Sequence, residues 1–172
     1  DGGLINVRSG SGTSVIELDA RNDRVLLADN IQLKLGTGGD LFAYHSGTDT
    51  LFRNNTGNLY IDQLADDKDI ILRSDDGSGG VTAYLTLDGS AVLTQFDKDT
   101  KHTDGVEAQF GNSADIKIYH NGGGNSNFEN SSGDLYFTQY TDDGDIFFRT
   151  DDGSGGVANY IQIDGGSEYV YF

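Results

Sequence analysis

The chain of 172 residues contains 25 glycines and no proline, cysteine, methionine or tryptophan. Without cysteine it has neither a disulfide framework nor a thiolate metal site, and no apolar run reaches the length of a membrane span or a signal-peptide core. The formal net charge of −17 argues against nucleic acid and anionic membranes as partners, because both require a basic surface.

In chain order, a partial unit is followed by two copies of one unit. Residues 1–28 resemble the C-terminal part of a preceding repeat, residues 29–103 form repeat 1 and residues 104–172 form repeat 2. An acidic, glycine-rich loop at residues 74–81 returns with nearly the same sequence at residues 150–157. Because the sequence opens inside a unit and lacks methionine, we expect a parent chain that is longer at its N-terminus.

Each unit is predicted to consist of short strands and turns. Apolar residues alternate with polar ones, the signature of strands with one buried face, and clusters of Gly, Asn, Asp and Ser interrupt them about every 8 to 12 residues. In the first copy the alternating residues are Ile31, Leu33 and Leu35; Leu41 and Ala43; Leu59 and Ile61; Ile70 and Leu72; and Val81, Ala83, Leu85 and Leu87. The pattern predicts an all-β fold, with helix poorly supported.

The apolar faces of these strands must be covered. A β-sandwich in each unit or a β-solenoid would cover them within one chain. We prefer an intertwined trimeric β-fibre, similar to a β-helix or β-prism, in which three chains close around one axis. Hydrophobic residues make up only 35% of the chain, so a lone unit would have a thin core. The predicted assembly is therefore a homotrimer.

The acidic loops contain candidate metal ligands. Asp75 and Asp76, with Asp151 and Asp152 in the second copy, carry the hard oxygen atoms that Ca²⁺ or another divalent ion prefers. No EF-hand loop or RTX nonapeptide is present. The same residues are typical of a solvated turn in which Asp bonds to the local backbone and Gly takes positive φ. We prefer the turn, and no cofactor is required by the sequence.

His45 and His120 end equivalent strands in the two copies. Alternation places each histidine on the apolar side of its strand. In a trimer, three copies of one histidine could converge near the axis and bind a metal ion or an anion. The preferred interpretation is a histidine that caps the strand and hydrogen bonds to the following turn.

Four tyrosines are candidate carbohydrate-binding residues: Tyr44 and Tyr60 in the first copy, and Tyr119 and Tyr136 in the second. They fall opposite the aliphatic side of their strands, where a flat ring can stack on a sugar while its hydroxyl stays hydrated. Packing on a neighbouring strand or chain is the more ordinary role for such side chains, and we prefer it.

No pattern marks a catalytic site. The P-loop, G-x-S-x-G, H-E-x-x-H and dinucleotide-binding signatures are absent. Acidic residues are numerous, but nothing singles out a pair for glycoside hydrolysis. We therefore expect a protein that is not an enzyme. A polysaccharide depolymerase, either a hydrolase or a lyase with carboxylates in a groove between chains, is kept as an alternative.

Four motifs of the first copy, taken together, resemble the repeats of a known family. They are Gly-Asp-Leu-x-x-Tyr-His at 39–45, Thr-Gly-Asn-Leu-Tyr-Ile at 56–61, Asp-Gly-Ser-Gly-Gly-Val at 76–81 and Tyr-Leu-x-Leu-Asp-Gly at 84–89. This series is similar to repeats in virion structural proteins of marine tailed bacteriophages, including cyanophages, where they occur in tail-fibre-like or other appendage proteins. The resemblance covers both full copies and, faintly, the partial unit that precedes them.

The resemblance implies a non-catalytic structural segment of a bacteriophage fibre, in a tail fibre or other virion appendage, that is involved in host-surface attachment. It implies a homotrimer with other virion proteins and host cell-surface polysaccharide as partners, located in the virion outside the cell. It supplies no catalytic residues. A calcium-stabilised secreted bacterial adhesin is a further alternative.

Overall fold

The structure is a computed structural model that describes residues 4–12, 14–20 and 22–172. All regular structure in these residues is β, with 15 strands and no helix, so the predicted all-β fold is confirmed. The described residues accordingly include no helix that is long and apolar enough for a membrane crossing. The chain divides into two compact units, Asp1–Lys98 and Asp99–Phe172.

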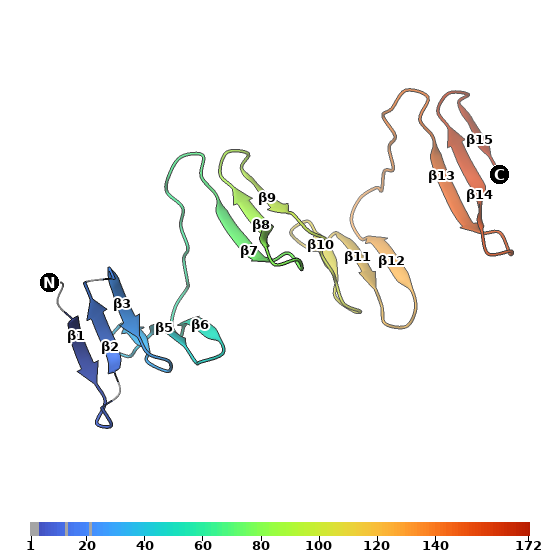
Figure 1. Cartoon of the computed structure of the whole chain (residues 1–172). Coiled ribbons are helices and arrows are strands. Elements are labelled where there is room, and N and C mark those ends of the chain that lie inside the picture. The colour runs from blue at the N-terminus through green and yellow to red at the C-terminus, as the bar shows by residue number, and fades with distance from the viewer. Residues whose placement is uncertain (1–3, 13, 21) are drawn as a thin grey trace. The chain divides into compact units, whose positions relative to one another are not determined.

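The strands form five antiparallel sheets of three strands each, and every sheet contains three consecutive strands (Figure 1). In the first unit, the first sheet contains β1 (Leu4–Arg8), β2 (Ser14–Asp19) and β3 (Arg24–Leu27), the second contains β4 (Leu33–Leu35), β5 (Leu41–His45) and β6 (Thr50–Asn54), and the third contains β7 (Ile70–Asp75), β8 (Val81–Asp88) and β9 (Leu93–Phe96). In the second unit, the fourth sheet contains β10 (Ala108–Phe110), β11 (Ile116–His120) and β12 (Ser126–Asn130), and the fifth contains β13 (Ile146–Asp151), β14 (Val157–Asp164) and β15 (Tyr169–Tyr171).

The sheets are of two kinds, and both kinds occur in each unit. The second and fourth sheets have the same strand lengths. The first, third and fifth sheets share a register shift in their first hairpin, each time just before an arginine: Arg8, Arg73 and Arg149. A bulge of this kind inserts one extra residue and bends the strand. The repeat boundaries at 28/29 and 103/104 stay a prediction.

Each sheet has one apolar face. In the third sheet, Ile70 lies opposite Leu87, and Leu72 lies opposite Leu85, which in turn lies opposite Phe96. Side chains two residues apart in a strand share a face, so these five apolar side chains form one surface. The second and fourth sheets have equivalent rows, Leu33–Ala43–Phe52 and Ala108–Ile118–Phe128, formed by residues that lie directly opposite one another.

These apolar faces are uncovered within each unit. Among the residues whose burial is described, no apolar side chain is buried, and the single buried residue is Asp19 at 2% exposure. Every extensive contact between strands lies within one sheet. Neither unit therefore contains the face-to-face packing of a β-sandwich or the stacked coils of a β-solenoid within its described residues.

Two segments expected to be strands are unpaired. The alternating residues Leu59 and Ile61, like Leu135 and Phe137 in the second copy, lie in connections without strand structure: residues 55–69, between β6 and β7, and residues 131–145, between β12 and β13. The pattern is that of a strand, but the described part of the chain offers no strand beside it. This part of the strand prediction is therefore wrong for a single chain.

Candidate functional site

The acidic loop between β7 and β8 is held by its own aspartates. One carboxylate oxygen of Asp76 (Oδ1) accepts hydrogen bonds from the backbone N–H of Ser78 (2.8 Å), the Ser78 hydroxyl (2.8 Å) and the backbone N–H of Gly80 (3.0 Å). The Asp75 carboxylate accepts one from Gly77 N–H at 2.9 Å. Gly77 has φ +80°, in the left-handed region that glycine adopts without steric cost.

The loop between β13 and β14 repeats this arrangement. Asp152 Oδ1 accepts from the backbone N–H of Ser154 (2.8 Å), the Ser154 hydroxyl (2.7 Å) and Gly156 N–H (3.1 Å), and Asp151 accepts from Gly153 N–H at 3.2 Å. The two loops therefore adopt the same conformation, and in both of them an aspartate that bonds to groups of its own loop is the cause.

These hydrogen bonds also favour the charged form of the Asp76 and Asp152 side chains, which we call the capping carboxylates. The Ser78 hydroxyl, followed by the backbone N–H groups of Ser78 and Gly80, lowers the pKa of Asp76 below its ordinary value. Ser154 is the main cause of the same lowering of the pKa of Asp152. Asp76 Oδ1 and Asp152 Oδ1 each already accept three hydrogen bonds, so these two oxygen atoms have little capacity left to coordinate a cation. Within the described residues, no group of three or more acidic or histidine side chains gathers around a metal-sized space.

The two histidines each contact an aspartate that lies far back in the sequence. His45 Nδ1 is 3.1 Å from Asp29 Oδ1, and His120 Nδ1 is 3.2 Å from Asp104 Oδ1. The backbone N–H of Gly47 also points to His45 Nδ1, at 3.1 Å. A ring protonated on Nδ1 donates to the aspartate, whereas a ring protonated only on Nε2 accepts from Gly47. According to which ring nitrogen carries the proton, the histidine ties the end of β5 either to Asp29, in the connection that precedes the sheet, or to the following turn at Gly47.

Sequence reasoning missed Asp29 and Asp104. The two aspartates are separated by the same interval as the two histidines (104 − 29 = 120 − 45), but every matched position in this part of the repeat shares that interval, so it does not single them out. The residue after each aspartate bonds to the backbone of the same histidine. The N–H of Asn30 donates to His45 O at 2.7 Å, and the N–H of Gly105 donates to His120 O at 2.8 Å.

His120 lies at the border of the apolar face of the fourth sheet. With His102, it lines a hollow of about 490 Å³ whose apolar wall is the row Ala108, Ile118 and Phe128. Strand alternation puts His120 on the same face as Ile118. The structure therefore places this histidine beside an uncovered apolar surface and leaves its role as a metal ligand a prediction.

The opposite face of the fourth sheet is polar. Lys117 Nζ lies 3.0 Å from Glu107 Oε2, and the Tyr119 hydroxyl donates to Glu129 Oε1 at 2.8 Å. The bond to Glu129 raises the pKa of the Tyr119 phenol, because a phenolate would face a carboxylate. Gln109 and then Lys117 lower the pKa of Glu107. The sheet thus presents a charged face and an apolar one.

Within each unit, the two predicted tyrosines are not brought together. Tyr44 packs against Phe42 with ring centroids 6.0 Å apart, on the face of β5 away from His45. Tyr119 occupies the equivalent place in β11, bonded to Glu129. Tyr60 and Tyr136 lie in the unpaired connections, with 75% and 79% of their surface exposed. No described contact joins Tyr44 to Tyr60 or Tyr119 to Tyr136, so a shared sugar platform within one chain is not seen.

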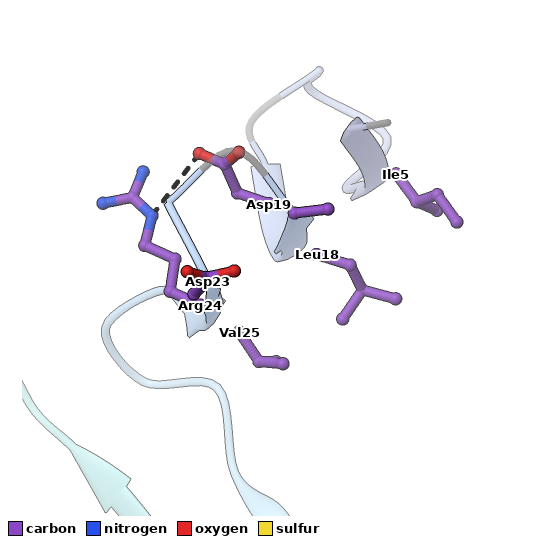
Figure 2. Close-up of a pocket in the computed structure, with 7 residues that line it drawn as sticks. Ile5, Leu18, Asp19, Asp23, Arg24 and Val25 are labelled. Carbon is purple, nitrogen blue, oxygen red and sulfur yellow. Dashed lines mark ion pairs between the residues drawn. The ribbon is translucent and has the colours of Figure 1, made fainter. Parts of the chain in front are cut away.

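The first sheet adds a hollow of about 420 Å³ that the sequence did not indicate. Figure 2 shows its apolar side chains, Ile5, Leu18 and Val25, pointing to one side, with Asp19 and Arg24 on the other. Arg24 Nε lies 3.7 Å from Asp19 Oδ2. The apolar wall is again the uncovered face of a sheet.

No protein-family model, curated protein or solved structure matches the chain. The function is therefore argued from geometry and from the sequence motifs. The feature common to all five sheets is an uncovered apolar face, and this face is the main candidate for a functional surface.

Proposed function

We propose that this chain is a non-catalytic structural segment of a homotrimeric bacteriophage fibre, in a tail fibre or another virion appendage, that takes part in attachment to the host surface. The observation that carries the proposal is the apolar face that each of the five sheets leaves uncovered. A face of this kind needs a partner with a similar face. A second and a third copy of the chain each supply the same five faces.

The exposed area supports association. Each of the five sheets exposes large apolar side chains, for example Ile5 at 62%, Leu33 at 52%, Leu72 at 56%, Phe128 at 48% and Phe148 at 50%. Burial of apolar area on this scale can outweigh the repulsion between chains that each carry a charge of −17.

The number of chains and the viral setting rest on the sequence motifs. Three copies would place the apolar faces of three equivalent sheets around one axis and leave the polar faces, with Tyr44 and Tyr119, outside. Exposed polar and aromatic groups suit contact with host polysaccharide, and other virion proteins would adjoin the ends of the segment. The proposed location is the virion, outside the cell.

Light scattering coupled to size exclusion tests the assembly. A homotrimer would have three times the mass of the 18.5 kDa chain, and a stable monomer at micromolar concentration would refute the proposal. Attachment is tested by binding of the trimer to immobilised bacterial surface polysaccharides. The double variant Tyr44→Ala/Tyr119→Ala should bind more weakly while remaining trimeric. Reducing-sugar release from the same polysaccharides would favour a depolymerase instead.

A further inference from the structure

Two stretches of the chain have the form of β-strands without a partner. Residues 58–63 follow β6 and residues 134–139 follow β12, and we call these stretches the bridging segments. Neither forms part of any sheet (Figure 1, in the connections from β6 to β7 and from β12 to β13). They occupy equivalent places in the two copies, since each follows the third strand of its sheet and precedes a bulged hairpin.

The side chains of the bridging segments alternate as in a strand. Asn58 Nδ2 donates to the Tyr60 hydroxyl at 3.2 Å, and the Tyr136 hydroxyl donates to Asp134 Oδ2 at 3.2 Å. Each bond joins residues two apart, which lie on the same side of an extended chain. The intervening and following apolar residues are therefore directed to the other side.

The backbones of the bridging segments lack partners within the described residues. Before the first segment, Asn54 Nδ2 donates to Gly57 O at 3.1 Å, and after it Ala65 N–H donates to the Gln63 side chain at 2.9 Å. Between these points no backbone N–H or C=O group of residues 58–62 bonds to another described backbone group. The second segment is bounded in the same way by bonds to Gly133 O and from Thr141 N–H.

The bridging segments are also apolar and exposed. Ile61 is 65% exposed and Phe137 61% exposed, although both residue types favour paired strands. The Phe137 ring lies 5.9 Å, between centroids, from that of Phe128, which belongs to the apolar row of the fourth sheet. The apolar side of this segment thus continues the uncovered face of the neighbouring sheet.

We propose that the bridging segments are the strands that pair between chains: in the oligomer, each adds by backbone hydrogen bonds to the open edge of a sheet in a neighbouring copy. The inference rests on the proposed homotrimer and specifies how its chains are joined. An extended apolar segment that meets an open sheet edge gains backbone bonds and buries its side chains in one step.

A second copy of the chain is the occupant that the repeated organisation favours. Each full repeat contains one bridging segment and also sheets with open edge strands, so a second copy of the chain offers an open edge for each segment. The apolar side of the segment also matches the apolar sheet faces of another copy. Each chain would then contribute strands to the sheets of another chain. Such pairing would make the fibre resistant to dissociation.

Hydrogen exchange of the full chain, read by mass spectrometry beside light scattering, tests the inference. The chain has no proline, so every residue of both segments carries an exchangeable amide. Because a strand added at one edge bonds through every second N–H group, we expect a trimer in which alternate amides of residues 59–63 and of residues 135–139 exchange at least about 100-fold more slowly than in unstructured peptides of the same sequence. A trimer in which they exchange as fast as the peptides would overturn this inference alone. A monomer would overturn both it and the proposed function.

Proline substitutions give a second test. Neighbouring N–H groups in a strand point to opposite edges, so a strand added at one edge uses alternate ones. Tyr60→Pro and Ile61→Pro are each compared with the alanine variant at the same position, which loses the same side chain. At least one proline variant should lower the trimer Tm well below that of its alanine counterpart. Both proline variants matching their alanine counterparts would contradict pairing, because proline fits an unpaired extended chain.

Discussion

Tyr84 donates a hydrogen bond from its phenol hydroxyl to the backbone carbonyl of Asp75, at 2.9 Å. Tyr160 makes the same bond to Asp151 O in the second copy, at 3.2 Å. Each tyrosine is the residue without a cross-strand partner at the register shift of its hairpin, and its ring reaches the loop that the hairpin carries. The loop is therefore fastened at two levels, by its own carboxylate and by a ring from the following strand.

Removing that hydroxyl should loosen the loop and leave the sheet intact. For Tyr84→Phe and Tyr160→Phe we expect a loss of about 0.5–1.5 kcal/mol per site in the free energy of unfolding, the usual net value of one hydrogen bond. Thermal unfolding at fixed protein concentration measures the change in stability. Exchange of the Gly77 and Gly153 amides should quicken at the same time. Unchanged exchange in both variants would show that the ring does not restrain the loop.

Adjacent residues of β7 separate the two faces of a sheet. Leu72 lies on the apolar face of the third sheet, and Ile71 lies on the polar face opposite Thr86. In the single chain Leu72 is 56% exposed and Ile71 40% exposed. If the chain acted alone, the more exposed leucine would be the easier of the two to replace.

In a trimer, Leu72 should be harder to replace than Ile71, because the apolar face would be buried between chains. Leu72→Asn should weaken association by about 1.5–3 kcal/mol per chain, the value of burying one such side chain, and Ile71→Asn should have little effect. Sedimentation equilibrium over a concentration series gives the trimer dissociation constant of each variant. Equal effects of the two substitutions would argue against an interface on the apolar face.

The sequence predicts what depends on near neighbours. Alternation of apolar residues identifies the hairpins and their faces. Asp76 can also be predicted as a turn residue, because its bonding partners lie only two and four positions later in the sequence. Contacts between distant positions are not readable in this way. Asp29 reaches His45 across a stretch of sequence that includes β4, and nothing local to either residue signals the pair.

The same limit explains the strand prediction that failed at Leu59 and Ile61. Alternation shows that a segment can form a strand, but a strand also needs a partner, and pairing is a non-local property. The structure of one chain contains no partner for this segment within its described residues. What the sequence could not predict is therefore the source of the pairing, which we assign to another copy.

Glycines after β8 and β14 allow a close approach of two backbone segments. A Cβ added to Gly89 would collide with the backbone carbonyl oxygen of Lys68, and one added to Gly165 would collide with that of Gly144. Gly89→Ala and Gly165→Ala should each lower stability by about 1–3 kcal/mol, as overpacking does. Gly10→Ala is the matched control, because its added Cβ would meet nothing within 4 Å. Thermal unfolding of the three variants gives the comparison, and equal Tm values would contradict it.

The capping carboxylates should make stability depend on pH in the acid range. Hydrogen bonds from Ser78 and Gly80 lower the pKa of Asp76 in the folded chain below its ordinary value of 3.8. The unfolded chain therefore takes up the proton first as the pH falls. The stability that the carboxylate contributes is complete above 3.8 and is lost as the pH falls through the lower folded value.

Asp76→Asn isolates this contribution, because asparagine keeps the shape and an acceptor oxygen but cannot ionise. At neutral pH the variant should unfold at a lower temperature than the wild type. The difference should shrink as the pH is lowered below 3.8, since the wild-type side chain then also becomes neutral. The overall reduction of negative charge affects both proteins alike and cancels in the comparison. A difference in Tm that stays constant across this range would mean that the charge of Asp76 does not stabilise the loop.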